Sequence, residues 1–430
     1  MKLCRRCLYP SFHPLGIDLD KEEVCSGCRV HDEKDQLDWA QRWTELEQLI
    51  DGYRGKDRLN YDCVIPVSGA RDSFFIVHTV KKKLGLNPLL VTYNKQYNTA
   101  VGIRNLARLR TELDCDIFTS TVDPDSVKRI TRATMMRFGS MYWHCLAGQT
   151  VYPVQVAVKF KIPLIIWGHH QGLDQVGMYS HLDKVEMTRR YRRNHDLMRR
   201  EADDLVSDYD FVKPSDVKAF LYPHDQELSA VGVRGIYLGN YMRWDTKAQH
   251  ESMIDLYDYE AVPSTRTFDT YNDVDCWMHS DVHDYIKWCK WGYGRARDHA
   301  VRELRFNRIS RKRALELALE YEVKPPRHLD LFLDWIGIDE KGFELVINQH
   351  RSPKAWHSRG LHQWQKPDEW LKAENEILAA EDEAEVNGGE SCSFRVRKSD
   401  PICDAQDKFI LIGKGNYRKP QESDPLVISK

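Results

Sequence analysis

The sequence lacks the long apolar runs that would carry it across a bilayer. No stretch of its 430 residues approaches the roughly 20 consecutive apolar residues of a membrane-spanning helix. Its first residues, MKLCRRCLYPSFHP, carry charge but no apolar run of about 7–15 residues ahead of a cleavage site. We therefore expect a cytoplasmic protein that neither spans a membrane nor carries a secretory signal.

The chain also lacks an excess of charge of either sign. Its 63 basic and 65 acidic residues give a formal net charge of −2, whereas a protein shaped for nucleic acid usually carries a basic footprint. The composition therefore favours small substrates and no nucleic-acid partner. The length predicts two or three folded units, because a single core rarely grows beyond about 250–300 residues.

Cysteine is sparse except in two close pairs near the amino terminus. Cys4 and Cys7 form one C-x-x-C pair, and Cys25 and Cys28 form another. Four thiolates at this spacing can close a tetrahedral shell around Zn²⁺ and leave no open position for catalysis. We predict a structural zinc ribbon or knuckle, with His31 as a spare ligand; the alternative is four unrelated thiols.

The single cysteines lack the sequence context of a nucleophile. No glutaminase domain is recognisable, so the chain shows no nitrogen source of its own. We expect these thiols to be small apolar core residues: Cys63, Cys115, Cys145, Cys276 and Cys289.

After the cysteine pairs, residues 37–49 read LDWAQRWTELEQL. Helical spacing brings Leu37, Trp43, Leu46 and Leu49 near one another, and Asp38 is a suitable N-cap residue. We predict a connecting helix that packs on the next domain.

The G-x-x-x-x-G-K-[ST] loop of ordinary nucleotide triphosphatases is absent, but another phosphate loop is predicted. Residues 62–67, DCVIPV, form a short β-branched run typical of a buried parallel strand. SGARDS follows at 68–73, and then the helical pattern FFIVHTVKKKLG. A strand, a tight loop and a helix start together bind an anion through backbone amides and the helix dipole.

Four residues of this hexapeptide suit phosphate binding. Gly69 permits close approach of the backbone, Ser68 and Ser73 offer hydroxyl donors, and Arg71 offers positive charge. The alternative is a serine-rich turn without a ligand.

Strand and helix patterns then alternate along the chain. Further strands are predicted at 88–93, 115–121, 163–168 and 234–239, with helices at 101–113, 125–138 and 146–160. This order predicts an α/β fold with a doubly wound parallel sheet. Because ligands bind beyond the carboxyl ends of such strands, the candidate ATP contacts are Thr92, Tyr93, Asn94, Gly168 and His169; ordinary loop structure is the alternative.

Two further segments carry candidate substrate ligands. Residues 184–200 hold seven Lys or Arg against two Asp or Glu, a local charge of +5, and guanidinium groups bind diphosphates in a bidentate manner. In WGYGRARDH at 291–299, two glycines flank an aromatic and cationic turn. The candidates are Arg189, Arg190, Arg192, Arg193, Tyr293 and Arg295. The alternatives are a basic face paired with the acidic EADD that follows, and a plain helix junction.

The loop resembles the S-G-G-x-D-S loop of the PP-loop ATP pyrophosphatases, which have a HUP-like fold. Ser68, Gly69, Asp72 and Ser73 match that pattern, and Ala70 departs from it. The resemblance implies that residues 68–73 bind pyrophosphate and that Arg71, Asp72 and Ser73 are catalytic. A methyl group disfavours positive φ, so either Ala70 has negative φ or the loop is distorted.

The resemblance narrows to the N-acetyl sugar amidotransferases of the WbpG/PseA-like group. It rests on the four-cysteine start, DWAQRWTELEQL, RGKDRLNYDCVIPVSGARDS, LGLNPLLVTYN, RGIYLGNYMRWD and KWGYGRARDHAVRELRFNRISRKRALELALEYE, and covers roughly residues 1–350. The expected parts are a zinc module at 1–50, a PP-loop domain at 55–250, a helical region at 251–370, in which Ser310 caps a helix, and an acidic, weakly ordered tail at 371–430.

The family resemblance implies a reaction. ATP, with Mg²⁺, adenylates the acetamido oxygen of a nucleotide-activated N-acetyl sugar, and ammonia then replaces that oxygen to give an acetamidino group in surface-polysaccharide (O-antigen) biosynthesis. Ammonia would come from a separate glutaminase, and oligomerisation is left open. The rival interpretations are a tRNA-modifying PP-loop enzyme of the thiolase or lysidine-synthetase type, and a catalytically degenerate scaffold subunit.

Overall fold

The computed structural model describes residues 2–55, 60–70, 72–360, 363–380, 392–396 and 409–410. Arg71, predicted to be catalytic and to bind pyrophosphate, lies outside the described residues. So does most of the acidic tail expected at 371–430.

The central sheet has five parallel strands in the order β4-β2-β1-β5-β6. The strands are β1 (Cys63–Pro66), β2 (Pro88–Tyr93), β4 (Ile117–Ser120), β5 (Leu164–Trp167) and β6 (Arg234–Tyr237). In the register, Val64 of β1 lies beside Leu89 on one side and Ile165 on the other. The order reverses at β1, so the predicted doubly wound α/β fold is confirmed.

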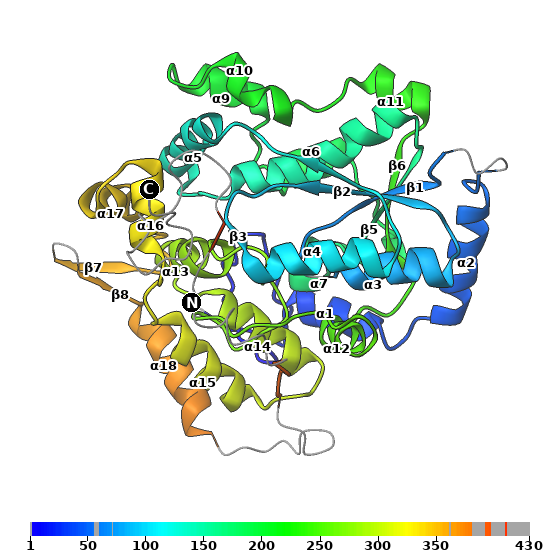
Figure 1. The fold of residues 1–430 in the computed structure, drawn as a ribbon. Helices are drawn as coiled ribbons and strands as arrows, with labels where there is room; N and C mark the ends of the chain where they lie inside the picture. Colours follow the sequence, from blue (N-terminus) through cyan, green and yellow to red (C-terminus); the bar gives the residue numbers. More distant parts are fainter. Residues whose placement is uncertain are drawn as a thin grey trace, which may run out of the picture.

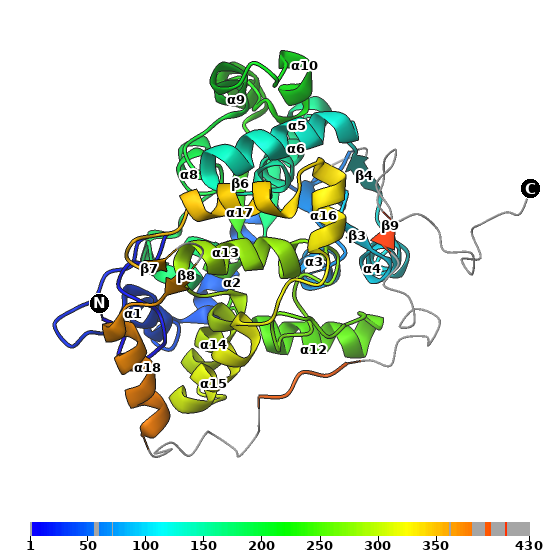
Figure 2. The same ribbon diagram turned by 90° about the vertical axis from the view of Figure 1, so that its left-hand side faces the viewer.

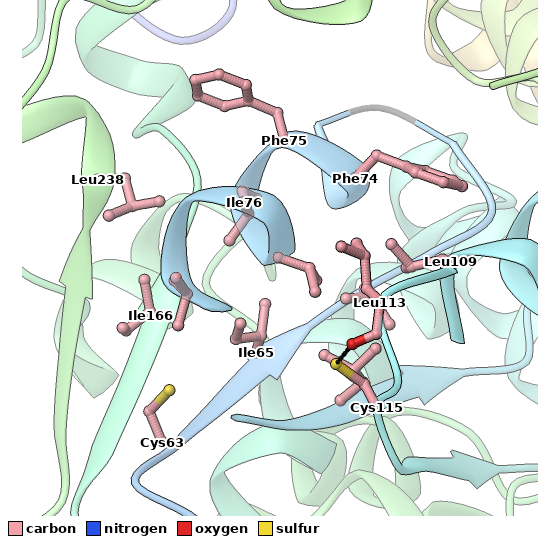
Figure 3. Close-up of a cluster of buried hydrophobic side chains, with 14 of the residues drawn as sticks. Cys63, Ile65, Phe74, Phe75, Ile76, Leu109, Leu113, Cys115, Ile166 and Leu238 are labelled. Carbon is pink, nitrogen blue, oxygen red and sulfur yellow. Dashed lines mark hydrogen bonds between the residues drawn. The ribbon is translucent and has the colours of Figure 1, made fainter. Parts of the chain in front are cut away.

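Helices cover both faces of this sheet (Figure 1). On one face, α6 (Trp143–Phe160) places Val154 and Ala157 against Val64 and Leu89. On the other face, α3 (Ser73–His78), α4 (Ala100–Glu112) and α2 (Trp39–Asp51) pack on the alternate strand residues, among them Ile65. Figure 3 shows this second cluster. Strands β1, β2 and β5 are buried on both faces, which explains why their sequences are mainly apolar.

The connecting helix forms where the sequence predicts it. The Asp38 side chain caps α2 by accepting a hydrogen bond from the Gln41 backbone amide at 2.9 Å. Leu46 and Ile50 are fully buried against the sheet domain, and Trp43 and Leu49 pack beside them. Leu37 precedes the helix and does not share this face. The helix therefore packs on the α/β domain, as predicted.

The carboxyl-terminal region is mainly helical, as expected. The Ser310 side chain caps α15 by accepting from the Arg313 amide at 3.2 Å. Its helices are α12 (Thr246–Tyr257), α13 (Asp284–Trp291), α14 (Arg295–Arg305), α15 (Arg311–Glu322), α16 (Leu329–Ile336), α17 (Glu340–Gln349) and α18 (Asp368–Ala379), with the hairpin β7 (His357–Gly360) and β8 (Gln363–Gln365). Helix α18 runs through the boundary expected at residue 370.

Shorter elements complete the described chain. They are α1 (Ser26–Glu33), β3 (Asn98–Thr99), α5 (Pro124–Phe138), α7 (Gln171–Val176), α8 (Arg189–Asn194), α9 (Ala202–Asp208), α10 (Pro214–Val217), α11 (Asp225–Val231) and β9 (Phe409–Ile410), the antiparallel partner of β3. Single 3₁₀ or π turns occur at Thr79–Lys83, His181–Asp183, Lys218–Phe220, Leu238–Asn240 and His279–His283. Among the described helices, none has the length and apolar character needed to cross a membrane.

The amino-terminal module packs against the end of the chain. Its cysteines, with Leu3, Leu8 and Tyr9, share one hydrophobic cluster with α14, α15 and α18. Figure 2 shows the amino-terminal segment beside these helices. The Tyr9 hydroxyl donates to Asp298 Oδ1 at 3.0 Å across 289 residues of sequence. The module and the helical region therefore form one packed unit.

Candidate functional site

The predicted phosphate loop joins β1 to α3 and is held together by its own serines. The Ser73 hydroxyl accepts from the Ser68 amide at 2.9 Å and donates to the Ala70 carbonyl at 3.0 Å. The Ala70 amide lies 3.2 Å from the Ser68 hydroxyl. Ala70 is buried and has negative φ, so its methyl group strains nothing. Of the two possibilities expected for Ala70, the structure therefore has negative φ at this residue.

The two glycines Gly69 and Gly102 bring three chain segments into close contact. A Cβ atom added to Gly69 would lie 2.0 Å from the Gly102 carbonyl oxygen, and one added to Gly102 would lie 2.3 Å from Asp275 Cα. The close approach expected at Gly69 is thus present, but its neighbour is the backbone of α4. The loop, α4 and residue 275 are fixed relative to one another.

Cavity A lies on the α4 side of the loop and has a volume of about 300 Å³. Ser68 and Gly69 form its end at the loop, while Ile103, Leu106 and Ile117 give it an apolar wall. The predicted ATP contacts Thr92, Tyr93 and Asn94 line it, together with Lys95, Asn98 and Asp275. The carboxyl ends of β2 and β4 therefore open onto a pocket beside the loop, as ligand sites in such sheets do.

Cavity B lies on the other side of the loop and has a volume of about 310 Å³. Asp72 and His169 line it near the loop. The amino-terminal module contributes Tyr9, His31 and Lys34, and the helical region contributes Arg295, Arg302 and Arg305 from α14. Three distant parts of the chain thus meet in one charged cavity.

A row of charged and polar groups crosses cavity B from the cysteine module to the loop. Lys34 Nζ lies 2.7 Å from Asp174 Oδ1, and Asp174 Oδ2 lies 3.9 Å from His169 Nε2. His169 Nδ1 in turn lies 3.3 Å from Asp72 Oδ2. Burial, the largest single influence, would raise the pKa of Asp174, but the neighbouring basic groups, Lys34 first among them, together outweigh it and hold that pKa well below its usual value. Asp174 is therefore ionised at neutral pH.

Cavity C, about 990 Å³, adjoins cavity B and shares Arg295, Tyr191 and Gln175 with it. Arg190, Arg199, Lys287 and Lys290 also line it. Cavity C gives the charged side of the site enough room for a ligand larger than a phosphate chain.

The basic helix α8 divides into structural and exposed residues. Arg192 is fully buried, pairs with Glu201 at 2.7 Å and lies 4.2 Å from the Tyr222 ring centre. Arg189 is exposed and approaches Glu201 and Asp225. Arg190 lines cavity C and Arg193 is exposed. Arg192 thus pairs with the first residue of the acidic EADD segment, as the alternative interpretation expects, but it is buried and not part of an exposed basic face.

The turn at 291–299 is a helix junction, and of its two predicted substrate ligands only Arg295 lines the cavities. Gly292 ends α13 with φ +76°, and Tyr293 is fully buried beside Tyr9 and His13. Tyr293 is thus a core residue in this structure. Arg295 pairs with Asp273 and lies where cavities B and C meet. The substrate role of Arg295 stays a prediction, and its position at the two cavities is compatible with that role.

The two predicted contacts after β5 differ in position. His169 lines cavity B. Gly168 packs internally: its carbonyl accepts from the Gly239 amide at 2.9 Å, and an added Cβ would lie 2.9 Å from the Ile76 side chain. Gly168 therefore packs the end of β5 against α3 and against the turn that follows β6.

The four predicted zinc ligands converge. The sulfurs of Cys4, Cys7, Cys25 and Cys28 all lie within 4.8 Å of one another, and all four residues are buried. Sulfurs around tetrahedral zinc are about 3.8 Å apart, given Zn–S bonds of about 2.3 Å, and Cys7 and Cys25 are 3.6 Å apart. The Cys25 amide and the Arg305 guanidinium lie 3.2 and 3.6 Å from cysteine sulfurs, as suits thiolate ligands. The site fits structural zinc.

His31 is not part of this group. Its ring packs edge-on against Phe306 with centroids 4.7 Å apart, and burial lowers its pKa to about 3. The five single cysteines named above are all buried thiols, as expected.

Sequence reasoning missed several residues that line the cavities: Lys34, Lys95, Asp174, Asp275, Arg302 and Arg305. Lys34 follows directly after α1, the helix that carries Cys28, and this position was a usable signal. Asp275 lies in a segment with no helical or strand period, so no local pattern marks it.

Comparisons with known proteins match one part of the chain. Residues 265–368 match the family model described as LPS biosynthesis protein WbpG-like, C-terminal domain. No curated protein matches the chain. Among solved structures, NMN synthetase from Francisella tularensis is 12% identical over 53% of this chain and 99% of that chain, with a TM-score of 0.25. The matched residues supply Asp275 to cavity A and the α14 arginines to cavity B. In agreement with the resemblance seen in the sequence, residues 265–368 of this chain are similar to the C-terminal domain of the WbpG-like LPS biosynthesis proteins.

Proposed function

We propose that the protein is an ATP-dependent N-acetyl sugar amidotransferase that converts the acetamido group of a nucleotide-activated sugar into an acetamidino group. The observation that carries this proposal is the position of the phosphate loop. It lies between an apolar-walled pocket suited to a nucleoside and a charged cavity formed in part by the WbpG-like region.

The loop suits the cleavage of ATP between its α and β phosphates. Its amides and the start of α3 favour an anion, while cavity A accommodates the nucleoside. Asp72 and Asp174 offer carboxylate oxygens at cavity B, which suit the Mg²⁺ that accompanies ATP. Electrostatic stabilisation of the leaving pyrophosphate would then lower the barrier.

Cavities B and C supply the acceptor side of the reaction. An amide oxygen is a poor leaving group, and its attack on the α phosphorus releases pyrophosphate and turns that oxygen into part of an AMP leaving group. Ammonia then adds to the same carbon, and the adduct loses one proton from the new nitrogen and expels AMP. The net change is amide, ATP and ammonia to amidine, AMP and pyrophosphate. Arg295, at the junction of cavities B and C, would face the sugar nucleotide.

The ammonia source is proposed to be a separate glutaminase. The described single cysteines are all buried or partly buried, and burial raises the pKa of Cys145 and Cys289 above that of a reactive thiol. Free ammonium should therefore replace the partner in a test tube.

The experiment measures pyrophosphate release from ATP with Mg²⁺ and ammonium. UDP-N-acetylglucosamine and related acetamido sugar nucleotides are the test substrates, and UDP-glucose is the control that lacks the acetamido group. With an oxygen-18 label in the acetamido group, the label should appear in AMP. Nitrogen-15 ammonium should label the sugar product.

Two outcomes would overturn the proposal. Turnover that requires tRNA and not a sugar would support the tRNA-modifying interpretation, with binding that weakens steeply as salt rises. ATP binding without pyrophosphate release under every condition would support a scaffold subunit.

A further inference from the structure

Asp275, which lines cavity A, has a buried carboxylate oxygen that the protein leaves without a hydrogen-bond partner. Asp275 is 6% exposed and its Oδ2 accepts from Lys95 Nζ at 2.7 Å, while its Oδ1 has no partner. A buried acceptor left unsatisfied is costly, so such a group in a native structure needs an explanation. A donor on a bound ligand is the explanation that the cavity offers.

The backbone fixes this carboxylate close to the phosphate loop. The Thr99 amide donates to the Asp275 carbonyl at 3.1 Å, and Asn98 forms a β-bridge with Cys276. The stacking of Gly69 on Gly102 and of Gly102 on Asp275 leaves no room for a side chain between them. Asp275 therefore cannot move away from the loop without disturbing α4.

The lining of cavity A changes along α4 in the order of the parts of a nucleotide. Gly102, beside the loop and Asp275, is followed by Ile103, Leu106 and Ala107, and Arg110 marks the far end. From Gly102 to Arg110 the helix rises about 12 Å, which is comparable with the length of a nucleoside. The order is thus a phosphate site, then a polar site with an unpaired acceptor, then an apolar site that suits a base.

We propose that Asp275 recognises the ribose of the bound nucleotide by accepting a hydrogen bond from a ribose hydroxyl. Lys95 pairs with the other carboxylate oxygen, fixes its orientation and carries positive charge toward the α phosphate. Because Asp275 lies within residues 265–368, the WbpG-like region completes the nucleotide site as well as the acceptor side. This inference rests on the proposed use of ATP, but not on the sugar substrate.

The test measures binding of ATP, 2′-deoxyATP and 3′-deoxyATP by calorimetry, without sugar or ammonium. The wild-type protein should bind ATP at least about 10-fold more tightly than one of the two deoxynucleotides, since the loss of a hydrogen bond to a charged group weakens binding by about that factor. Asp275→Asn should lose most of that preference. Lys95→Met should weaken the binding of all three nucleotides by similar factors.

Asp216→Asn is the matched control, because Asp216 is also a buried carboxylate that pairs with a basic residue, Arg129, but lies away from cavity A. It should retain the preference for ATP. Equal binding of the three nucleotides by the wild-type protein overturns the inference, even if Asp275→Asn does not fold, and so does an unchanged preference in a folded Asp275→Asn. If pyrophosphate release with acetamido sugars persists in either case, the proposed function stands; absence of ATP binding overturns both.

Discussion

The two cavities beside the phosphate loop are built in different ways. Most of cavity A comes from consecutive elements, β2, α4 and β4, and is apolar along one wall. Cavity B combines residues from segments as far apart as 9–34, 167–196 and 295–306, and nine of its lining side chains are charged. The difference indicates that cavity A depends mainly on local packing, whereas cavity B depends on contacts between distant segments of the chain. Perturbations should therefore separate the two.

Removing the metal should have the largest effect, and this effect should be on cavity B. Structural zinc binding contributes on the order of 10 kcal/mol to the folding of small zinc modules. We expect one zinc per chain by elemental analysis. Chelation should release Tyr9, His31 and Lys34 from cavity B and abolish turnover, while adenosine binding at cavity A persists. Loss of adenosine binding on chelation would contradict the separation of the cavities, and a protein without zinc that remains fully active would contradict the zinc site.

Breaking the Lys34–Asp174 pair should be the next largest perturbation. Lys34 is 3% exposed, and removal of one partner from a buried ion pair costs about 3–5 kcal/mol. Lys34→Met should therefore lower the free energy of unfolding by about 3 kcal/mol in chemical denaturation, because Asp174 is less deeply buried than Lys34. The control is Lys34→Met combined with Asp174→Leu, which removes both charges and should recover part of the loss. A single variant as stable as the wild type would show that the row of charges is not coupled.

Ser73→Ala tests the loop that both cavities share. Without the hydroxyl that joins the Ser68 amide to the Ala70 carbonyl, the loop amides lose their fixed orientation. We expect turnover to fall about 100-fold with little change in melting temperature. Ser252→Ala, at an exposed position of α12, is the control. Equal turnover in both variants would remove the loop from the catalytic site.

The smallest predicted effect concerns His144, behind cavity A. Its Nδ1 lies 3.1 Å from the Tyr93 hydroxyl, and burial lowers its pKa to about 3. The unfolded chain takes up a proton below about pH 6.5 and the native chain does not, so stability is lost as pH falls from 6.5. The loss is about 1.4 kcal/mol per pH unit. His144→Gln should flatten the dependence of unfolding free energy on pH by that amount, whereas His357→Gln, at an exposed position, should not.

Local patterns in the sequence were sufficient for the sheet and the loop. The strand at 62–67, the caps Asp38 and Ser310 and the four cysteines each act through neighbours a few residues away, so spacing reveals them. Arg192 shows the limit of this reasoning. Its charge pattern suggested a phosphate ligand, but a partner nine residues away and a distant aromatic ring decide its position. The sequence did not predict Asp275 and Lys34 as residues of the site, because only tertiary packing brings them to the cavities beside the loop.

The contact between Tyr9 and Asp298 has a consequence for synthesis of the chain. Tyr9 leaves the ribosome 289 residues before Asp298, which lies in one of the helices that cover the module. At about 5–20 residues per second, the interval is roughly 15–60 seconds. During that time the four thiols, all within the first 28 residues, can gather around an ion without any other part of the chain. Metal supply during translation would then decide how many nascent chains mature.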